Sequence, residues 1–333
     1  MFDIPVVLFM FKREKAVEVV KRIGCVKPKK LYIIADGGRT PAEIEECRNC
    51  RKAVEKAIVW ECEIIRNYAE TNRGVFENIG LGAKWVFEHE DKAIFLEDDN
   101  LPSVSFFQFC KEMLEKYIDD ERILWICGTN YLGNKRYTTC SYYFTRHMMP
   151  CGWASWSKKF SKYYDPFIAD CDDEKLCENI KYIMRNDKLY RQYKYFWRSE
   201  KCRIDSGLKP LSWDYQMDFA IKSNDLLGIV PSANLIKNIG VDQFSIHGGH
   251  STKDTMTNRF CSMELYELDF PIIHPKHVIP TKDFEKAISK ILLYPLGLRI
   301  KNKVIITLRK VLKLPAGKTI HELLKREEND KRN

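Results

Sequence analysis

Short continuous runs of apolar residues alternate with amphipathic stretches through the first 120 residues. Continuous apolar runs are typical of strands buried on both faces, and apolar residues at helical spacing are typical of helices that cover a sheet. The pattern therefore predicts an α/β fold, a mostly parallel central sheet with helices on both faces. The predicted strands are residues 4–11, 29–36, 57–67 and 93–99, and the predicted helices are residues 13–23, 41–56, 78–90 and 104–117.

The pattern becomes less regular after residue 120. A helix is predicted to open at or near Trp213-Asp214, and a strand with a turn follows it. The full set of expected segments is a strand at 123–130, a strand or loop at 141–150, an aromatic-rich loop entering a helix at 151–165, helices at 174–204 and 211–225, a strand and turn at 226–240, and a loop with two histidines at 241–254.

Carboxylates gather where two of the predicted strands end. The run AIFLEDDNLPS closes one strand with Glu97, Asp98 and Asp99, and Asp36 closes an earlier strand before two glycines. Because ligands of parallel sheets lie beyond the carboxyl ends of the strands, these acids could line one crevice. Mg²⁺ and Mn²⁺ take oxygen ligands and often combine few carboxylates with phosphate and water. The cluster therefore suits a metal–diphosphate site. A solvated acidic turn, with Asp36 as a turn-former, is the alternative.

Several segments, in this order along the chain, resemble GT-A glycosyltransferases over roughly residues 4–250. The EDD triplet resembles their metal–nucleotide motif. PVVLFMFKR and IIADGGR resemble the first two strands of family-2-type enzymes, and RNYAETNRGVFENIG resembles their N-x-G segment. GWASWSKKF and SWDYQ resemble acceptor-side segments of bacterial sugar transferases related to N-acetylglucosaminyltransferase I. IKNIGVDQFSIHGG resembles the loop that brings a histidine towards the metal in that group.

This resemblance implies the GT-A fold for residues 1–280, with a nucleotide-sugar-binding half at 1–120 and an acceptor-side half at 121–280. Residues 281–333 would then be a basic helical tail. The implied activity is that of an inverting glycosyltransferase dependent on Mn²⁺ or Mg²⁺. It would move a hexosyl or N-acetylhexosaminyl group from a nucleotide sugar, UDP-sugars first, to a glycan or lipid-linked glycan in polysaccharide assembly.

The resemblance also implies roles for single residues. Asp99 would be the direct metal ligand, and His247 would be the loop histidine that contacts the metal or the diphosphate. Asp36 would contact the nucleoside, and the two other acids of the triplet would contact the nucleotide or the donor sugar. Arginines suit diphosphate contacts because guanidinium matches phosphate geometry, with solvated surface arginines as the alternative. The nucleotide-sugar contacts so predicted are Arg13, Asp36, Arg66, Asn72, Glu97 and Asp98.

Inverting transfer needs a carboxylate that takes the proton of the acceptor hydroxyl. Asp214 is the candidate, because it stands at a predicted helix start between two aromatic residues that suit a sugar. A helix cap is the alternative role for it, and Asp218 and Asp165 are the other carboxylates considered. Trp153 and Trp213 are predicted to contact the acceptor, whereas Trp156 is expected to pack inside.

The basic charge of the chain is concentrated at its end. Residues 281–333 contain 14 Lys and Arg against 6 Asp and Glu, which is +8 of the total +9. LRIKNKVIITLRKVLKL places apolar residues on one helical face with basic residues around the other. Such a helix could lie on an anionic membrane surface through residues 284–318, or pack on the domain with a solvated basic side. Nucleic acid is not the expected partner, because the segment lacks interleaved aromatic residues.

Composition narrows the setting. With 45% hydrophobic and 12% aromatic residues, the chain is expected to be globular. No apolar run reaches the roughly 18–20 residues that span a bilayer, and the N-terminus resembles a buried strand more than a signal peptide. We therefore expect a cytoplasmic protein, with a peripheral position on the inner face of the membrane if the tail binds there. The 12 cysteines are scattered, and a lone Cys47-x-x-Cys50 favours reduced thiols over zinc.

Two other functions compete with glycosyl transfer. A sugar-1-phosphate nucleotidyltransferase would share the α/β core, but it usually has a glycine-rich loop after the first strand, where FMFKREK has no glycine. A catalytically inactive glycan-binding or assembly protein on the same scaffold is the second alternative. The intact triplet together with Asp214 argues against it.

Overall fold

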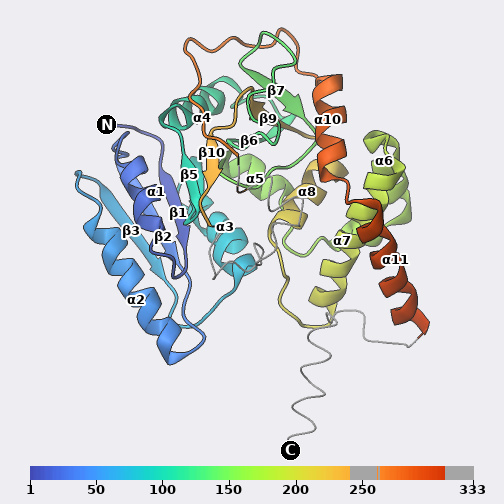
Figure 1. Ribbon diagram of the computed structural model, residues 1–333, viewed down its shortest axis with the longest axis horizontal. Coiled ribbons are helices and arrows are strands. Elements are labelled where there is room, and N and C mark those ends of the chain that lie inside the picture. Colours follow the sequence, from blue (N-terminus) through green and yellow to red (C-terminus); the bar gives the residue numbers. More distant parts are fainter. Residues whose placement is uncertain (241–260, 262, 312–333) are drawn as a thin grey trace, which may run out of the picture.

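A mixed eight-stranded sheet forms the centre of the chain in a computed structural model that describes residues 1–240, 261 and 263–311 (Figure 1). In spatial order the strands are β3 (Glu63–Tyr68), β2 (Lys30–Ala35), β1 (Val6–Met10), β4 (Lys92–Glu97), β8 (Trp153–Trp156), β6 (Ile123–Cys127), β9 (Leu227–Pro231) and β7 (Tyr142–Thr145). The first four strands run parallel to one another, and β6 and β9 also pair parallel. β8 and β7 run antiparallel to their neighbours.

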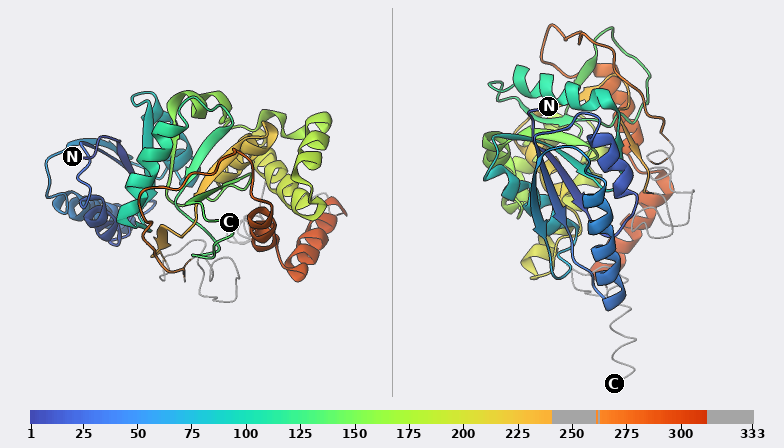
Figure 2. Two further views of the ribbon diagram at one scale, coloured as in Figure 1. Left: turned by 90° about the horizontal axis from the view of Figure 1, so that it is seen from above. Right: turned by 90° about the vertical axis from the view of Figure 1, so that its left-hand side faces the viewer.

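Helices cover both faces of this sheet (Figure 2), which confirms the predicted fold class. Side chains alternate along a strand, so Val6 and Leu8 of β1 join one core whereas Val7 and Phe9 join the other. This is why the strands are continuous apolar runs. The first core is covered by α1 (Ala16–Ile23), α2 (Pro41–Lys56) and α4 (Val104–Lys116), and the second by η1 (Phe76–Leu81), α3 (Gly82–Phe87), α5 (Ser157–Tyr163) and α8 (Asp214–Ser223).

Three elements differ from their predicted form. Residues 153–156, expected in a loop, form the buried strand β8 between β4 and β6. The helical region expected at 174–204 is two helices, α6 (Glu174–Met184) and α7 (Asp187–Asp205). They are separated because Arg185 adopts a left-handed φ of 48° and the Asn186 side chain caps α7. β3 begins at Glu63, later than the apolar run suggests, and Val59 in the preceding loop is 89% exposed.

A two-stranded ribbon, which the sequence analysis did not predict, follows the acidic triplet. β5 (Asn100–Pro102) pairs antiparallel with β10 (Ile236–Asn238). The ribbon ties the triplet to the later chain, because the Ile239 N–H donates to the Asp99 carbonyl oxygen (2.8 Å). Asn100 is fully buried and donates from Nδ2 to Asp99 Oδ1 (2.6 Å). The ribbon therefore fixes the orientation of the last acid of the triplet.

The chain ends, as far as it is described, in α10 (Lys282–Leu292) and α11 (Leu296–Val311). Phe284 and Ile288 of α10 are completely buried in the second core, and Phe284 stacks on Tyr143 with ring centroids 4.4 Å apart. The segment predicted as a tail from residue 281 thus begins inside the packed domain. In the described part of the chain no helix is both long and apolar enough to cross a membrane.

Candidate active site

The acidic triplet lies at the carboxyl end of β4, next to the end of β1. β1 and β4 are parallel neighbours with Phe9 opposite Glu97, so the residues after β1 reach the turn that follows Glu97. The Phe11 N–H donates to Asp98 Oδ2 (2.9 Å). Asp99 is instead turned towards the β5–β10 ribbon through Asn100. Asp98 and Asp99 therefore accept from different neighbours, the backbone after β1 and the β5–β10 ribbon.

Arg13 supplies positive charge to this cluster. Its Nη1 lies 2.5 Å from Asp99 Oδ2 and 3.4 Å from Asp98 Oδ1. The structure thus places Arg13 in the predicted site, where it bridges two of the acids. Burial and the charge of Asp99 raise the pKa of Asp98 to about 7, although Arg13 and the Phe11 N–H act in the opposite direction. One guanidinium does not fully compensate the triplet.

Glu97 is the acid of the triplet with the fewest stabilising contacts. Its carboxylate has no hydrogen-bond donor among the described residues. Burial raises the pKa of Glu97 well above its usual range, and the charges of Asp99, Asp98 and Asp214 raise it further. The effect of Asp214 is informative, since this residue comes from the half of the chain that was predicted to bind the acceptor. The structure therefore brings the predicted base and the acidic strand end into one electrostatic environment.

Asp214 is the first residue of α8, and its N–H donates to Ser212 Oγ (3.2 Å). Burial raises the pKa of Asp214 to about 7, with smaller contributions from the charges of Asp218 and Glu200. α7 holds the loop that leads to it: Glu200 Oε2 accepts from the Leu211 N–H (2.8 Å). The sequence analysis did not identify Glu200, whose spacing on α7 shows only an amphipathic helix.

The two other carboxylates considered as bases are occupied. Asp218 is buried, forms an ion pair with Lys222 and accepts from Trp197 Nε1 (3.2 Å). Asp165 accepts from two backbone N–H groups of the loop that follows it, at 2.9 and 2.6 Å. Both therefore have structural roles, whereas Asp214 is among the charges that raise the pKa of Glu97.

Asp36 holds a loop in place. Its two carboxylate oxygens accept from the N–H groups of Gly37 (2.8 Å), Arg73 (2.6 Å) and Gly74 (3.0 Å) and from Asn72 Nδ2 (2.9 Å). An ionised carboxylate has about four acceptor positions, so these donors occupy Asp36. The predicted residues Asp36 and Asn72 do lie together at the strand ends. Direct contact of Asp36 with a nucleoside would require one of these donors to leave.

Arg66 does not lie with the other predicted residues. It stands within β3, and its Nε and Nη2 lie 3.0 and 3.1 Å from the carboxylate oxygens of Glu55 on α2. Its side chain is 45% exposed. The ion pair with Glu55 directs the guanidinium along the outer edge of the sheet, away from the acidic strand end.

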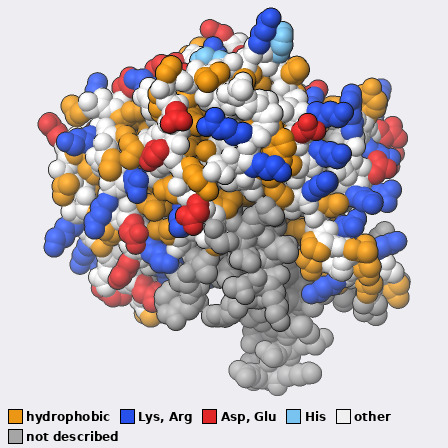
Figure 3. Space-filling model, turned by 45° about the horizontal axis from the view of Figure 1, so that its top comes forward, with side chains coloured by type: hydrophobic (Ala, Val, Ile, Leu, Met, Phe, Trp, Pro, Cys, Tyr) orange, Lys and Arg blue, Asp and Glu red, His pale blue; other side chains and the backbone are white. Residues whose placement is uncertain are grey.

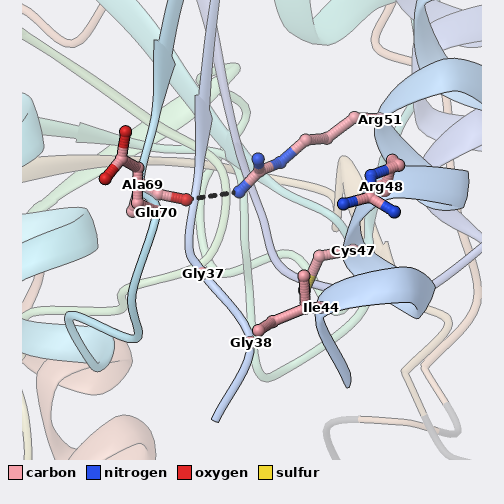
Figure 4. Close-up of a pocket in the computed structure, with 8 residues that line it drawn as sticks. All are labelled: Gly37, Gly38, Ile44, Cys47, Arg48, Arg51, Ala69 and Glu70. Atoms are coloured by element: carbon pink, nitrogen blue, oxygen red, sulfur yellow. Dashed lines mark hydrogen bonds between the residues drawn. The ribbon is translucent and has the colours of Figure 1, made fainter. Parts of the chain in front are cut away.

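Arg51 lies at the strand ends instead, although the sequence analysis did not single it out. Its Nη2 donates to the carbonyl oxygens of Asp36 (2.8 Å) and Ala69 (2.9 Å), and its guanidinium lies 4.8 Å from the centre of the Tyr68 ring. It thereby joins the ends of β2 and β3. A hollow of about 240 Å³ lies beside it (Figure 4). Its lining residues are Gly37, Gly38, Ile44, Cys47, Arg48, Arg51, Ala69 and Glu70.

Replacing Arg51 by alanine is expected to lower the free energy of unfolding by about 1–3 kcal/mol, because two carbonyl acceptors lose their donor. Urea denaturation measures this change. Arg48→Ala is the matched control, since the Arg48 side chain is 57% exposed and pairs with Glu45 on the same helix. Its effect should stay within about 0.5 kcal/mol. Equal effects of the two substitutions would contradict the role assigned to Arg51.

Trp153 and Trp213, which were predicted to contact the acceptor, are buried in the core instead. Trp153 is 1% exposed and lies between the rings of Phe95 and Trp125, with centroid distances of 4.0 and 4.3 Å. Trp213 is 4% exposed and stacks on Trp153. β8 is a central strand covered on both faces, so its aromatic side chains belong to the core. Trp156 also lies inside, as expected, and donates from Nε1 to the Leu114 carbonyl oxygen.

The residues around Asp99 have the chemistry that a hard cation requires. They offer carboxylate oxygens, the ligands that Mg²⁺ and Mn²⁺ prefer. The backbone of Gly240 lies so close that any side chain there would collide with the Asp99 carboxylate. Among the described residues no three His, Cys, Asp or Glu side chains converge on one metal position. A site with one or two protein ligands fits this arrangement. His247, the other predicted ligand, lies outside the described residues.

Comparison with known proteins gives limited similarity. No family model matches the chain, and no curated protein matches it. Three solved structures are similar at a low level. The 4-diphosphocytidyl-2C-methyl-D-erythritol synthase of Anaerococcus prevotii is 10% identical with a TM-score of 0.33, over 51% of this chain and 78% of that one. A UDP-glucose pyrophosphorylase complexed with UDP-glucose is 12% identical with a TM-score of 0.26, over 44% and 62%. The apo bifunctional glycosyltransferase WbbM is 10% identical with a TM-score of 0.30, over 67% and 38%. Similarity at this level carries no argument about function.

Proposed function

We propose that the chain is a glycosyltransferase that moves a sugar, with inversion, from a nucleoside diphosphate donor to a hydroxyl group of a glycan or lipid-linked glycan. The observation that supports this most strongly is the shared environment of Asp214 and Glu97. A carboxylate with a pKa near 7 from the predicted acceptor-side half acts electrostatically on an acidic strand end in the other half. Inverting transfer requires a base beside a site for a charged donor.

In this proposal Asp214 takes the proton of the acceptor hydroxyl while the hydroxyl oxygen bonds to the anomeric carbon. The bond from that carbon to the diphosphate breaks, and its electron pair leaves with the nucleoside diphosphate. Arg13 provides positive charge beside the triplet for the phosphates. The Asp36-held loop at residues 72–74 forms the neighbouring wall, where the nucleoside would bind. A divalent cation, when bound at Asp99, would neutralise diphosphate charge and stabilise the leaving group.

A donor screen tests this function. Thermal shift with Mn²⁺ and a panel of UDP-, GDP- and TDP-sugars should identify a stabilising donor. Release of nucleoside diphosphate from that donor should follow, and it should be lost in Asp99→Asn. A protein that is stabilised by a donor but neither hydrolyses nor transfers it would be an inactive binding scaffold. Pyrophosphate release from a nucleoside triphosphate and a sugar phosphate would indicate nucleotidyl transfer and would overturn the proposal.

A further inference from the structure

The last described helix leaves an apolar stripe in solvent. Leu296, Ile300, Val304 and Val311 of α11 are 63%, 55%, 51% and 71% exposed. Their spacings of four, four and seven residues keep them on one side of the helix. Isolated exposed apolar residues are common, but four on a single helix side form a surface that favours a partner.

Basic residues border this stripe. Lys301 and Lys303 are exposed on α11, and by helical geometry they fall on opposite sides of the stripe. From Lys286 to Lys318 the sequence contains nine Lys and Arg and no Asp or Glu. In Figure 3, Lys and Arg side chains lie beside exposed hydrophobic side chains on the right of the molecule, the side on which Figure 1 places α6, α7, α10 and α11. The surface is therefore apolar at its centre and positive at its edges.

The beginning of α11 is held on the domain. Gln192 of α7 donates from Nε2 to the Leu292 carbonyl oxygen and accepts from the Tyr294 N–H at Oε1, both at 2.8 Å. The Tyr294 ring packs against Phe196 with centroids 5.6 Å apart. Because Phe284 and Ile288 anchor α10 in the core and hydrogen bonds hold this junction on α7, the first turn of α11 has a fixed position. The stripe faces solvent while the helix start is attached.

We propose that α11 docks on an anionic phospholipid surface, with its apolar stripe in the headgroup–acyl boundary and its lysines on the lipid phosphates. Charge complementarity selects this partner. A second copy of the chain would place like charges together along the helix. Nucleic acid would satisfy the lysines but leave the stripe in water. The inference does not depend on the proposed glycosyl transfer.

Vesicle sedimentation with the full chain tests this docking. Binding to phosphatidylcholine vesicles should rise on the order of tenfold or more when phosphatidylglycerol is included, and it should fall as salt is added. The double variant Ile300→Ser/Val304→Ser should lose binding to either composition. Lys301→Gln/Lys303→Gln should lose only the part that depends on anionic lipid. All four positions are exposed, so the fold should be preserved.

Val59→Ser is the matched control, because Val59 is 89% exposed but lies before β3 at the far side of the sheet. It should bind vesicles like the unchanged chain. The proposal is overturned if the unchanged chain binds no vesicles, if neutral and anionic vesicles bind equally, or if the serine variant still binds. It is also overturned if the chain is a dimer that Ile300→Ser/Val304→Ser converts to a monomer, since the stripe would then be covered by a second copy.

Discussion

Replacing Asp214 by asparagine is expected to lower sugar transfer by about 10²- to 10⁴-fold, because the acceptor hydroxyl loses its proton acceptor. Donor binding, followed by thermal shift, should remain, since the donor contacts come from the other half of the chain. The fold should also remain. Burial raises the pKa of Asp214 from its usual 3.8 to about 7, so its carboxyl group destabilises the fold increasingly between these pH values and fully above about 7; the neutral amide removes that penalty.

Asp218→Asn is the control for this prediction. Asp218 lies one helical turn after Asp214, but its carboxylate neutralises the buried Lys222. Removing one partner of a buried ion pair costs about 3–5 kcal/mol, so Asp218→Asn should unfold at clearly lower denaturant concentration. The two substitutions should therefore have opposite signatures: Asp214→Asn folded and inactive, Asp218→Asn destabilised. Full transfer by Asp214→Asn would remove this residue from the chemistry.

The raised pKa of Asp214 also predicts how the rate of transfer depends on pH. A base must be deprotonated, so transfer should fall as the pH drops through about 7, the pKa of Asp214. The Glu200 charge is one cause of that raised pKa. Glu200→Gln retains an oxygen that can accept from the Leu211 N–H but removes the charge. In Glu200→Gln the fall of the transfer rate on the acidic side of the pH profile should therefore occur at lower pH. If this fall keeps its pH in Glu200→Gln but disappears in Asp214→Asn, Asp214 is the titrating base and the Glu200 charge does not raise its pKa.

Much of the first half of the fold was predictable because β1, β2 and β4 are apolar on both faces. Residues such as Val7 and Leu8 enter different cores, which produces the continuous runs that the sequence shows. The second half was harder because two of its strands, β7 and β8, have only four residues and pair antiparallel with their neighbours. β8 combines two tryptophans with two small residues, a pattern that also suits a loop. Only its insertion between β4 and β6 makes it a strand, and no local sequence signal contains that information.

Some residues of the candidate site could likewise be located from the sequence, and others could not. Carboxylates at strand ends can be located from the strands, and the structure does place Asp99 beside Arg13. Residues that act through backbone carbonyls cannot be located so easily. Arg51 is one of several basic residues on α2, and only the approach of the β2 and β3 ends gives it acceptors. An aromatic residue next to the Asp214 carboxylate suggested sugar stacking, but the burial of Trp213 shows that it belongs to the core.

Two substitutions in the acidic triplet should have different consequences although each removes one negative charge. Glu97→Gln should raise the stability of the metal-free protein at neutral pH, because Glu97 is crowded by three carboxylates and has no hydrogen-bond donor among the described residues. Asp99→Asn should gain less, because it also loses the ion pair with Arg13. Thermal unfolding without added metal measures the difference. A lower stability for Glu97→Gln would contradict the crowding of charge.

The same two substitutions also test which acid of the triplet binds the cation. If Asp99 is the ligand, the additional stabilisation that Mn²⁺ gives in the presence of a nucleoside diphosphate should be lost in Asp99→Asn and kept in Glu97→Gln. At about 100 times the dissociation constant this stabilisation is about 2.7 kcal/mol, well within the range of a thermal shift. Sugar transfer should fall in both variants. Loss of the Mn²⁺ effect in Glu97→Gln alone would move the cation to the first acid of the triplet, because the site would then lie at the strand end and not at the ribbon.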